Sequence, residues 1–129
     1  MRPFMLLVVA VGALALSVPA ALATTASDTG DDGITVTVSL SDTATPGEPF
    51  TVAESIQNAN TRARLLRVTQ TLKGPEGVVF SIRYPLIIPA GKTLAFELTF
   101  TFPENVPPGT YSLTLTAGDA SATAETEVS

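Results

Sequence analysis

The chain of 129 residues contains no cysteine, no histidine and no tryptophan. Without cysteine it forms no disulfide and has no thiol nucleophile, and without histidine it has no serine–histidine–aspartate triad and no zinc site of the Cys/His type. A Gly-x-Ser-x-Gly motif is also missing. The residue types that remain give no cofactor or metal site, and we expect neither.

Basic residues are scarce as well. The sequence has 7 lysines and arginines against 12 aspartates and glutamates. Arg2 is the one charged residue among the first 23, so residues 24–129 carry six positive and twelve negative charges, a net charge of −6. A chain of this charge is a poor general binder of nucleic acids, and we expect no nucleic-acid partner.

Residues 1–23 have the three parts of a secretory signal peptide. Arg2 and the amino terminus form a short positive region, and an uninterrupted apolar stretch of 13 residues follows over 4–16. Pro19 ends any helix there, and Ala21-Leu22-Ala23 offers the small residues that a signal peptidase requires. The leader therefore predicts cleavage after residue 23.

The alternative for this leader is an uncleaved anchor helix. A helix needs roughly 20 apolar residues to span a bilayer, which is longer than the stretch present here. No later segment is apolar for long enough either, so we expect no membrane span in the mature protein. We predict export to the periplasm or the exterior, and the absence of disulfides in a small exported domain favours a bacterial setting.

The chain after the leader divides into two parts. Residues 24–33 are small, polar and acidic, and predict a flexible acidic lead-in. Residues 34–129 alternate apolar and polar side chains in short runs separated by turn residues, most clearly over 94–102 and 111–117. This pattern predicts an all-β domain, an antiparallel β-sandwich of about seven strands.

Three details refine this prediction. The segment 50–72 has some helical spacing, but the asparagines and threonine at 58–61 disfavour a helix. Glu54 interrupts an apolar row, which predicts a β-bulge at that position. Residues 120–128 are weakly apolar and carry two glutamates, which is typical of an edge strand.

The run Pro108-Gly109-Thr110-Tyr111-Ser112-Leu113 resembles the entry to strand F of immunoglobulin-like and fibronectin type III-like domains, in particular bacterial extracellular members. The resemblance implies that Tyr111 closes a corner with its hydroxyl bonded back to the chain, and that Gly109 belongs to the same structural corner. The chain departs from antibody domains because it has no cysteine pair and no tryptophan. The fold implied is an immunoglobulin-like β-sandwich, which by itself implies no activity.

Catalytic groups are not combined in any recognisable way. A serine–lysine pair would require Lys73 or Lys92, and both lie in predicted turns. A pair of carboxylates for glycoside hydrolysis is equally unsupported, because the glutamates fall on different predicted elements. The spacing of the aspartates within 28–32 also lacks the alternation of a calcium loop. We expect a protein that is not an enzyme.

The positive charges are concentrated in one segment. Residues 62–83 contain five of the six basic residues of 24–129 and a single acid, so this segment carries a net charge of +4 and the rest −10. The candidate partner-binding residues are Arg62, Arg64, Arg67 and Arg83. The alternative is an ordinary group of solvated charges without a partner.

A hairpin centred on Pro75 makes this cluster more specific. In that register Leu72 faces Val78, and Arg67 lies directly opposite Arg83 on the outward face. Two like charges opposed across a strand pair are unfavourable unless an anion or a partner's carboxylates lie between them. The partner is expected to be an acidic protein, a second copy bound head to tail, or an anionic glycan.

These observations predict an exported, non-catalytic structural or protein-interaction module of the bacterial envelope or exterior. The alternative is a small carbohydrate-binding module. Sugar-binding platforms usually consist of exposed aromatic rings, but both tyrosines, Tyr84 and Tyr111, lie on the predicted core side of their strands.

The predicted cleavage site can be checked directly. We expect the exported protein to begin at Thr24, because small residues precede it and Pro19 ends the apolar helix of the leader. Amino-terminal sequencing of the exported protein measures this. Recovery of intact Met1 in the membrane fraction would contradict the prediction.

Overall fold

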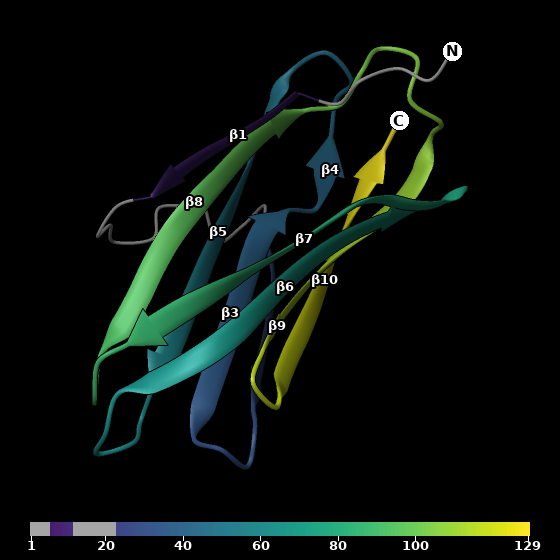
Figure 1. Ribbon diagram of the computed structural model, residues 1–129. Coiled ribbons are helices and arrows are strands. Elements are labelled where there is room, and N and C mark those ends of the chain that lie inside the picture. The colour runs from purple at the N-terminus through teal and green to yellow at the C-terminus, as the bar shows by residue number, and fades with distance from the viewer. Residues whose placement is uncertain (1–5, 12–22) are drawn as a thin grey trace.

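The computed structural model describes residues 6–11 and 23–129, and this part of the chain is all-β (Figure 1). No helix among these residues is long and apolar enough to cross a membrane. The strands are β1 Leu6–Val11, β2 Ala23–Thr29, β3 Ile34–Ser41, β4 Thr43–Ala44, β5 Pro49–Asn58, β6 Arg64–Gly74, β7 Gly77–Ile88, β8 Thr93–Thr101, β9 Gly109–Ala117 and β10 Ala120–Val128.

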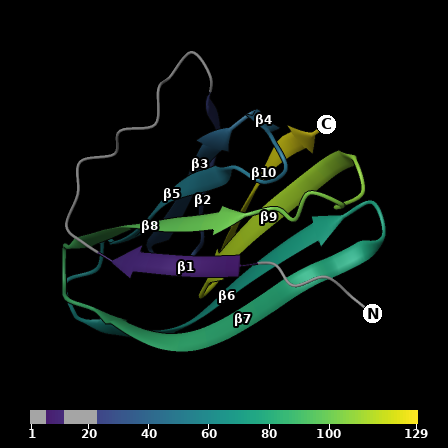
Figure 2. The ribbon, with the colours of Figure 1, turned by 90° about the horizontal axis from the view of Figure 1, so that it is seen from above.

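The strands form two five-stranded sheets that pack as two layers (Figure 2). The first has the order β1-β8-β5-β3-β2, and the second has the order β4-β10-β9-β6-β7. All neighbouring strands are antiparallel except β4, which runs parallel to the end of β10. The prediction of an all-β β-sandwich is confirmed, but the described residues form ten strands and not about seven, and the β4–β10 pair is not antiparallel.

Strand β1 lies within the segment predicted to be a signal peptide. It pairs with β8 from Leu6 opposite Thr101 to Val11 opposite Phe96. The rest of that segment, residues 1–5 and 12–22, lies outside the described residues. Cleavage after residue 23 would remove β1 and leave this edge of β8 without a neighbour.

The predicted flexible lead-in is wrong for residues 24–29, which belong to strand β2. This strand pairs with β3 in register from Ala23 opposite Ser41 to Thr29 opposite Thr35. Hydroxyl groups join the two strands across the outward face, including Thr29 to Thr35 at 2.8 Å and Ser27 to Thr37 at 3.1 Å. The segment is ordered because β3 supplies backbone and hydroxyl partners, which its polar composition alone did not indicate.

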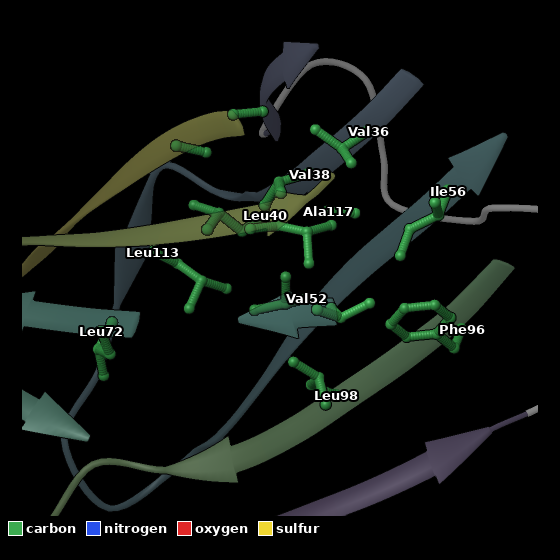
Figure 3. Close-up of a cluster of buried hydrophobic side chains, with 14 of the residues drawn as sticks. Val36, Val38, Leu40, Val52, Ile56, Leu72, Phe96, Leu98, Leu113 and Ala117 are labelled. Carbon is green, nitrogen blue, oxygen red and sulfur yellow. The ribbon is translucent and has the colours of Figure 1, made fainter. Parts of the chain in front are cut away.

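The hydrophobic core lies between the two sheets, where apolar side chains at period two face one another (Figure 3). Val36, Val38 and Leu40 of β3 line it from one sheet, and Leu113 and Ala117 of β9 line it from the other. Burial of such rows supplies about 25 cal/mol for each square ångström of apolar surface removed from water. The period-two pattern therefore fixes which face of each strand is buried.

The hairpin between β6 and β7 differs from its predicted register. Gly74 pairs with Gly77 across the two-residue turn, and a register shift next to Leu72 adds one residue to β7. Beyond that shift Leu72 lies opposite Phe80, not Val78. The predicted bulge at Glu54 is also wrong, because β5 pairs regularly with both of its neighbours. The irregularity lies in the β6–β7 hairpin instead.

Tyr111 joins the start of β9 to that same hairpin. It is buried, and its hydroxyl donates a hydrogen bond to the carbonyl oxygen of Pro107 at 2.7 Å. Its ring lies against Gly74, where an added Cβ would clash with the ring carbon Cε2. Gly109 has a φ of 139°, and a Cβ there would meet the Pro75 ring at 2.7 Å. Both glycines therefore allow the chain to close around the tyrosine.

The Tyr111 hydrogen bond gives a stability prediction. Tyr111→Phe keeps the ring but removes the hydroxyl, so we expect a loss of about 1 kcal/mol in the free energy of unfolding. Denaturant midpoints of the wild type and the variant measure this loss, with Ser112→Ala on the same strand as the control. Equal midpoints for Tyr111→Phe and the wild type would contradict this role of the hydroxyl.

Candidate functional site

The predicted partner-binding arginines lie on and next to the β6–β7 hairpin. Arg67 and Arg83 are exposed on its outward face, and Arg62 is exposed just before β6. Arg64 is half-buried, and its Nη1 lies 3.5 Å from the carbonyl oxygen of Asp32. Strands β6 and β7 contain no acidic residue, so this face has positive charge alone.

The predicted pairing of Arg67 directly opposite Arg83 is wrong. Arg67 lies opposite Pro85, and Arg83 lies opposite Thr69, because β7 is displaced from the predicted register once by the two-residue turn and once more by the extra residue before Phe80. The shift is an even number of positions, so both arginines stay on the outward face as diagonal neighbours. The charges remain on one face, but the like-charge opposition from which an acidic partner was inferred does not exist.

Exposed apolar side chains share this face. Leu65 is 70 % exposed and Ile87 is 64 % exposed, and the two lie directly opposite one another. Val78 and Val79 are exposed at the other end of the hairpin. All four large hydrophobic residues that are exposed in the described part of the chain therefore belong to β6 and β7. We call the outward side of these two strands the β6–β7 face.

Sequence reasoning found the charges of the β6–β7 face but missed its apolar side chains. Leu65 and Ile87 each stand next to buried residues, Leu66 and Ile88, in continuous apolar runs. The sequence indicated this only through apolar residues at both odd and even positions of these runs, which makes both faces of the strand apolar. In an antiparallel sheet with one solvated face, such a run indicates a second surface to be covered.

The other end of the same sheet has the opposite character. Strand β10 exposes Glu125 and Glu127, and the hydroxyl groups of Thr114 and Thr123 bond across β9 and β10 at 2.8 Å. The second sheet thus changes from acidic and hydroxyl-rich at β10 to basic and apolar at β7. The exposed large apolar side chains of this sheet therefore lie at its β6–β7 end.

The aspartates that precede β3 act as acceptors for backbone amides. Asp28 Oδ2 accepts a hydrogen bond from the Ser121 amide at 2.9 Å, and Asp32 Oδ2 accepts one from Asp119 at 3.0 Å. No group of three or more acidic side chains that could hold a metal ion occurs among residues 6–11 and 23–129. These aspartates join β2 and its turn to the start of β10.

Asn58 organises the loop that carries Arg62. Its side chain is fully buried, and its Nδ2 donates to the carbonyl oxygens of Arg62 at 2.9 Å and Ile88 at 3.0 Å. Its Oδ1 accepts from the amide of Asn60 at 2.9 Å. The sequence indicated only a polar loop here, whereas the tertiary contacts make this residue the link between the core and the open end of the β6–β7 hairpin, where β6 begins and β7 ends.

A second unusual group lies inside the sandwich, where Glu54 of β5 faces Gln70 of β6. Both side chains are buried, Glu54 completely. Gln70 Nε2 donates to the hydroxyl of Tyr84 at 3.0 Å. Both carboxyl oxygens of Glu54 and the Oε1 of Gln70 have no hydrogen-bond partner among the described residues.

These unpaired oxygens are explained if Glu54 is protonated. Burial raises the pKa of the Glu54 carboxyl from 4.5 to about 8, and the Gln70 side chain opposes the rise. A neutral carboxyl has an O–H donor, and the neighbouring Gln70 side chain has an unpaired acceptor, Oε1. Burial likewise raises the pKa of the Tyr84 hydroxyl. The cluster is therefore uncharged at neutral pH.

Comparison with known proteins identifies the fold but no family. No protein-family model matches the chain, and no curated protein matches it. Similar solved structures include a Paenibacillus cycloisomaltooligosaccharide glucanotransferase, with 25 % identity and a TM-score of 0.59 over 79 % of this chain. A mutant β-glucosidase from Listeria innocua has 16 % identity and a TM-score of 0.58 over 74 % of this chain.

This chain spans 14 % and 16 % of the length of those two enzymes. The C-terminal domain of wzt has 11 % identity and a TM-score of 0.54, with 81 % of this chain and 78 % of that one covered. The likeness is to sandwich domains, two of which are parts of much larger carbohydrate-active proteins. These comparisons show a shared all-β fold.

The buried carboxyl predicts an unusual pH dependence of stability. The folded state holds the Glu54 proton up to about pH 8, while the unfolded chain releases it near 4.5. The contribution of Glu54 is therefore complete below pH 4.5 and is lost as the pH rises to about 8, with up to a tenfold fall in the folding equilibrium constant for each pH unit.

Denaturant unfolding at pH 5 and pH 8 measures this effect. We expect Glu54→Gln to remove most of the difference between the two pH values, because the amide does not ionise. Glu97→Gln, on the outward side of the adjacent strand β8, is the matched control and should keep the wild-type dependence. An unchanged pH dependence in Glu54→Gln would show that this carboxyl is not the titrating group.

Proposed function

We propose that this protein is an exported, non-catalytic interaction module of the bacterial envelope or exterior, built on an immunoglobulin-like β-sandwich. The β6–β7 face binds an acidic protein partner. The single observation that carries the proposal is the joint exposure of apolar and basic side chains on a face with no carboxylate.

The strand order supports the immunoglobulin-like part of the proposal. Strands β3, β5 and β8 are neighbours in one sheet, as are strands A, B and E of that fold. Strands β6, β9 and β10 are neighbours in the other sheet, as are C, F and G, with β7 in the position of C′. Tyr111 then stands at the start of strand F, and its bond to the Pro107 carbonyl agrees with a tyrosine corner.

A binding role is favoured over catalysis by the position of the perturbed carboxyl. Glu54 has the raised pKa that an active-site acid can have, but it is fully buried between the sheets and cannot reach a substrate. The exposed features are instead those of an interface, a group of apolar side chains with charges around it.

The alternative remains a small carbohydrate-binding module, since two of the similar structures are of carbohydrate-active enzymes. The large apolar side chains exposed in the described part of the chain are leucine, isoleucine and valine, not aromatic rings. Phe80 and Tyr84 face inward and are half-buried. Aliphatic side chains beside arginines suit a protein partner better than a sugar ring.

Binding to a polyanion tests the proposed face. We expect a fluorescently labelled polyglutamate chain to bind the purified protein at 0.1 M salt and to lose most of its affinity at 1 M. Over this range the Debye length falls from about 10 Å to about 3 Å. Arg67→Ser/Arg83→Ser should weaken binding several-fold at low salt, whereas Arg67→Lys/Arg83→Lys retains the charge and should bind nearly as the wild type does.

Two further measurements separate the alternatives. Tighter binding of polygalacturonate than of polyglutamate would favour an anionic glycan as the ligand. Salt-sensitive sedimentation of the protein alone as a dimer would favour a second copy. Polyanion binding that is indifferent to both salt and the double serine substitution would overturn the role of this face.

A further inference from the structure

Strand β7 leaves one long edge of the second sheet without a neighbour. It spans Gly77–Ile88, the longest strand of the described chain, and pairs there with β6 alone. The backbone groups on its outer edge therefore have no sheet partner among these residues. An exposed edge of this kind is a template on which another extended chain can pair.

The opposite edge of the same sheet is covered at both of its ends. The Ser121 amide of β10 is bonded to Asp28, and the Glu127 amide is bonded to the carbonyl oxygen of Asp42. The two-residue strand β4 pairs with the end of β10, and β10 itself contains Glu125 and Glu127. Strand β10 is thus protected in the way that natural edge strands usually are.

The middle of β7 lacks such protection. Its interruptions are the extra residue next to Phe80 and the proline at Pro85, and both lie at the ends of the central stretch. Residues 80–84 contain no proline, glycine or acid, and Arg83 is their one charge. These five successive residues therefore form a regular strand edge without the features that usually prevent pairing with another chain.

Both faces of β7 also have surface left to cover. The inward residues Phe80, Ile82, Tyr84 and Leu86 are only half-buried, although three of them pack against the core. On the outward side Arg83 is exposed beside Thr69, with Arg67 as its diagonal neighbour. A strand added at this edge would place apolar side chains over the inward row and carboxylates beside the arginines.

We propose that β7 binds its acidic partner by strand addition, pairing with an extended segment in which apolar and acidic residues alternate. The apolar positions cover Phe80, Ile82 and Tyr84, and the acidic positions lie beside Arg83. Main-chain hydrogen bonds hold the segment, and the alternating side chains select it. This inference rests on the proposed function, because it uses the same hairpin, and it adds the conformation and pattern of the partner.

A synthetic peptide of alternating glutamate and valine, labelled at one end, is the probe. Successive residues of a strand direct their backbone groups to opposite edges, so N-methylation of every valine blocks one edge and N-methylation of every glutamate blocks the other. We expect the unmodified peptide to bind at 0.1 M salt. One methylated peptide should bind comparably, and the other at least tenfold more weakly.

Amide hydrogen exchange supplies an independent readout. Binding of the unmodified peptide should slow exchange at alternate residues of β7 and leave β10 unchanged, because only the outer-edge amides gain partners. A peptide with the same composition but with its glutamates and valines in separate blocks is the control for charge and hydrophobicity, and should bind more weakly.

The outcomes distinguish this inference from the proposed function. Equal binding of both methylated peptides, combined with loss of binding in Arg67→Ser/Arg83→Ser, would overturn strand addition while the acidic-partner face stands. Failure of the alternating peptide to bind, with polyglutamate still bound, would have the same meaning. Failure of every acidic probe would overturn both.

Discussion

The packing of two sheets through facing apolar rows is the interaction on which the rest of this protein depends. The chain has no cysteine, so no disulfide reinforces the layers. Their association rests on side chains such as Val38 and Leu113, which come from opposite sheets and are fully removed from water. A polar group buried between the sheets must therefore be hydrogen-bonded or uncharged. The free energy needed to desolvate an unpaired charge exceeds the free energy gained from a single contact.

Glu54 is the group that this constraint affects most. Its position on the inward parity of β5 places a carboxyl where the neighbouring rows are apolar, and burial favours its protonated form. Gln70 faces it from the second sheet, and Gln70 Nε2 donates to the hydroxyl of Tyr84.

The outer surface of the second sheet, unlike its interior, has apolar side chains that no other part of the described chain covers. The Tyr111 corner anchors the turn of the β6–β7 hairpin through Gly74, and Asn58 anchors its other end through the Ile88 carbonyl. The hairpin held in this way presents Leu65, Ile87 and the side chains of Arg67 and Arg83 to solvent. A rigidly held hairpin with exposed apolar area loses little conformational entropy when a partner binds.

The sequence by itself determined the strands and their buried faces. The alternation in 94–102 and 111–117 is local, and a period of two requires one face to be apolar. It did not determine which strands pair or in what register. Strand β2 was missed because its partners are hydroxyl and backbone groups of β3. The β6–β7 register was missed because the two-residue turn and one extra residue each move every later pair by one position. Whether Glu54 bends its strand or enters the core, and whether Leu65 is covered, depends on residues distant in sequence. Only the tertiary structure decided these points, because burial is a property of neighbours and not of the local pattern.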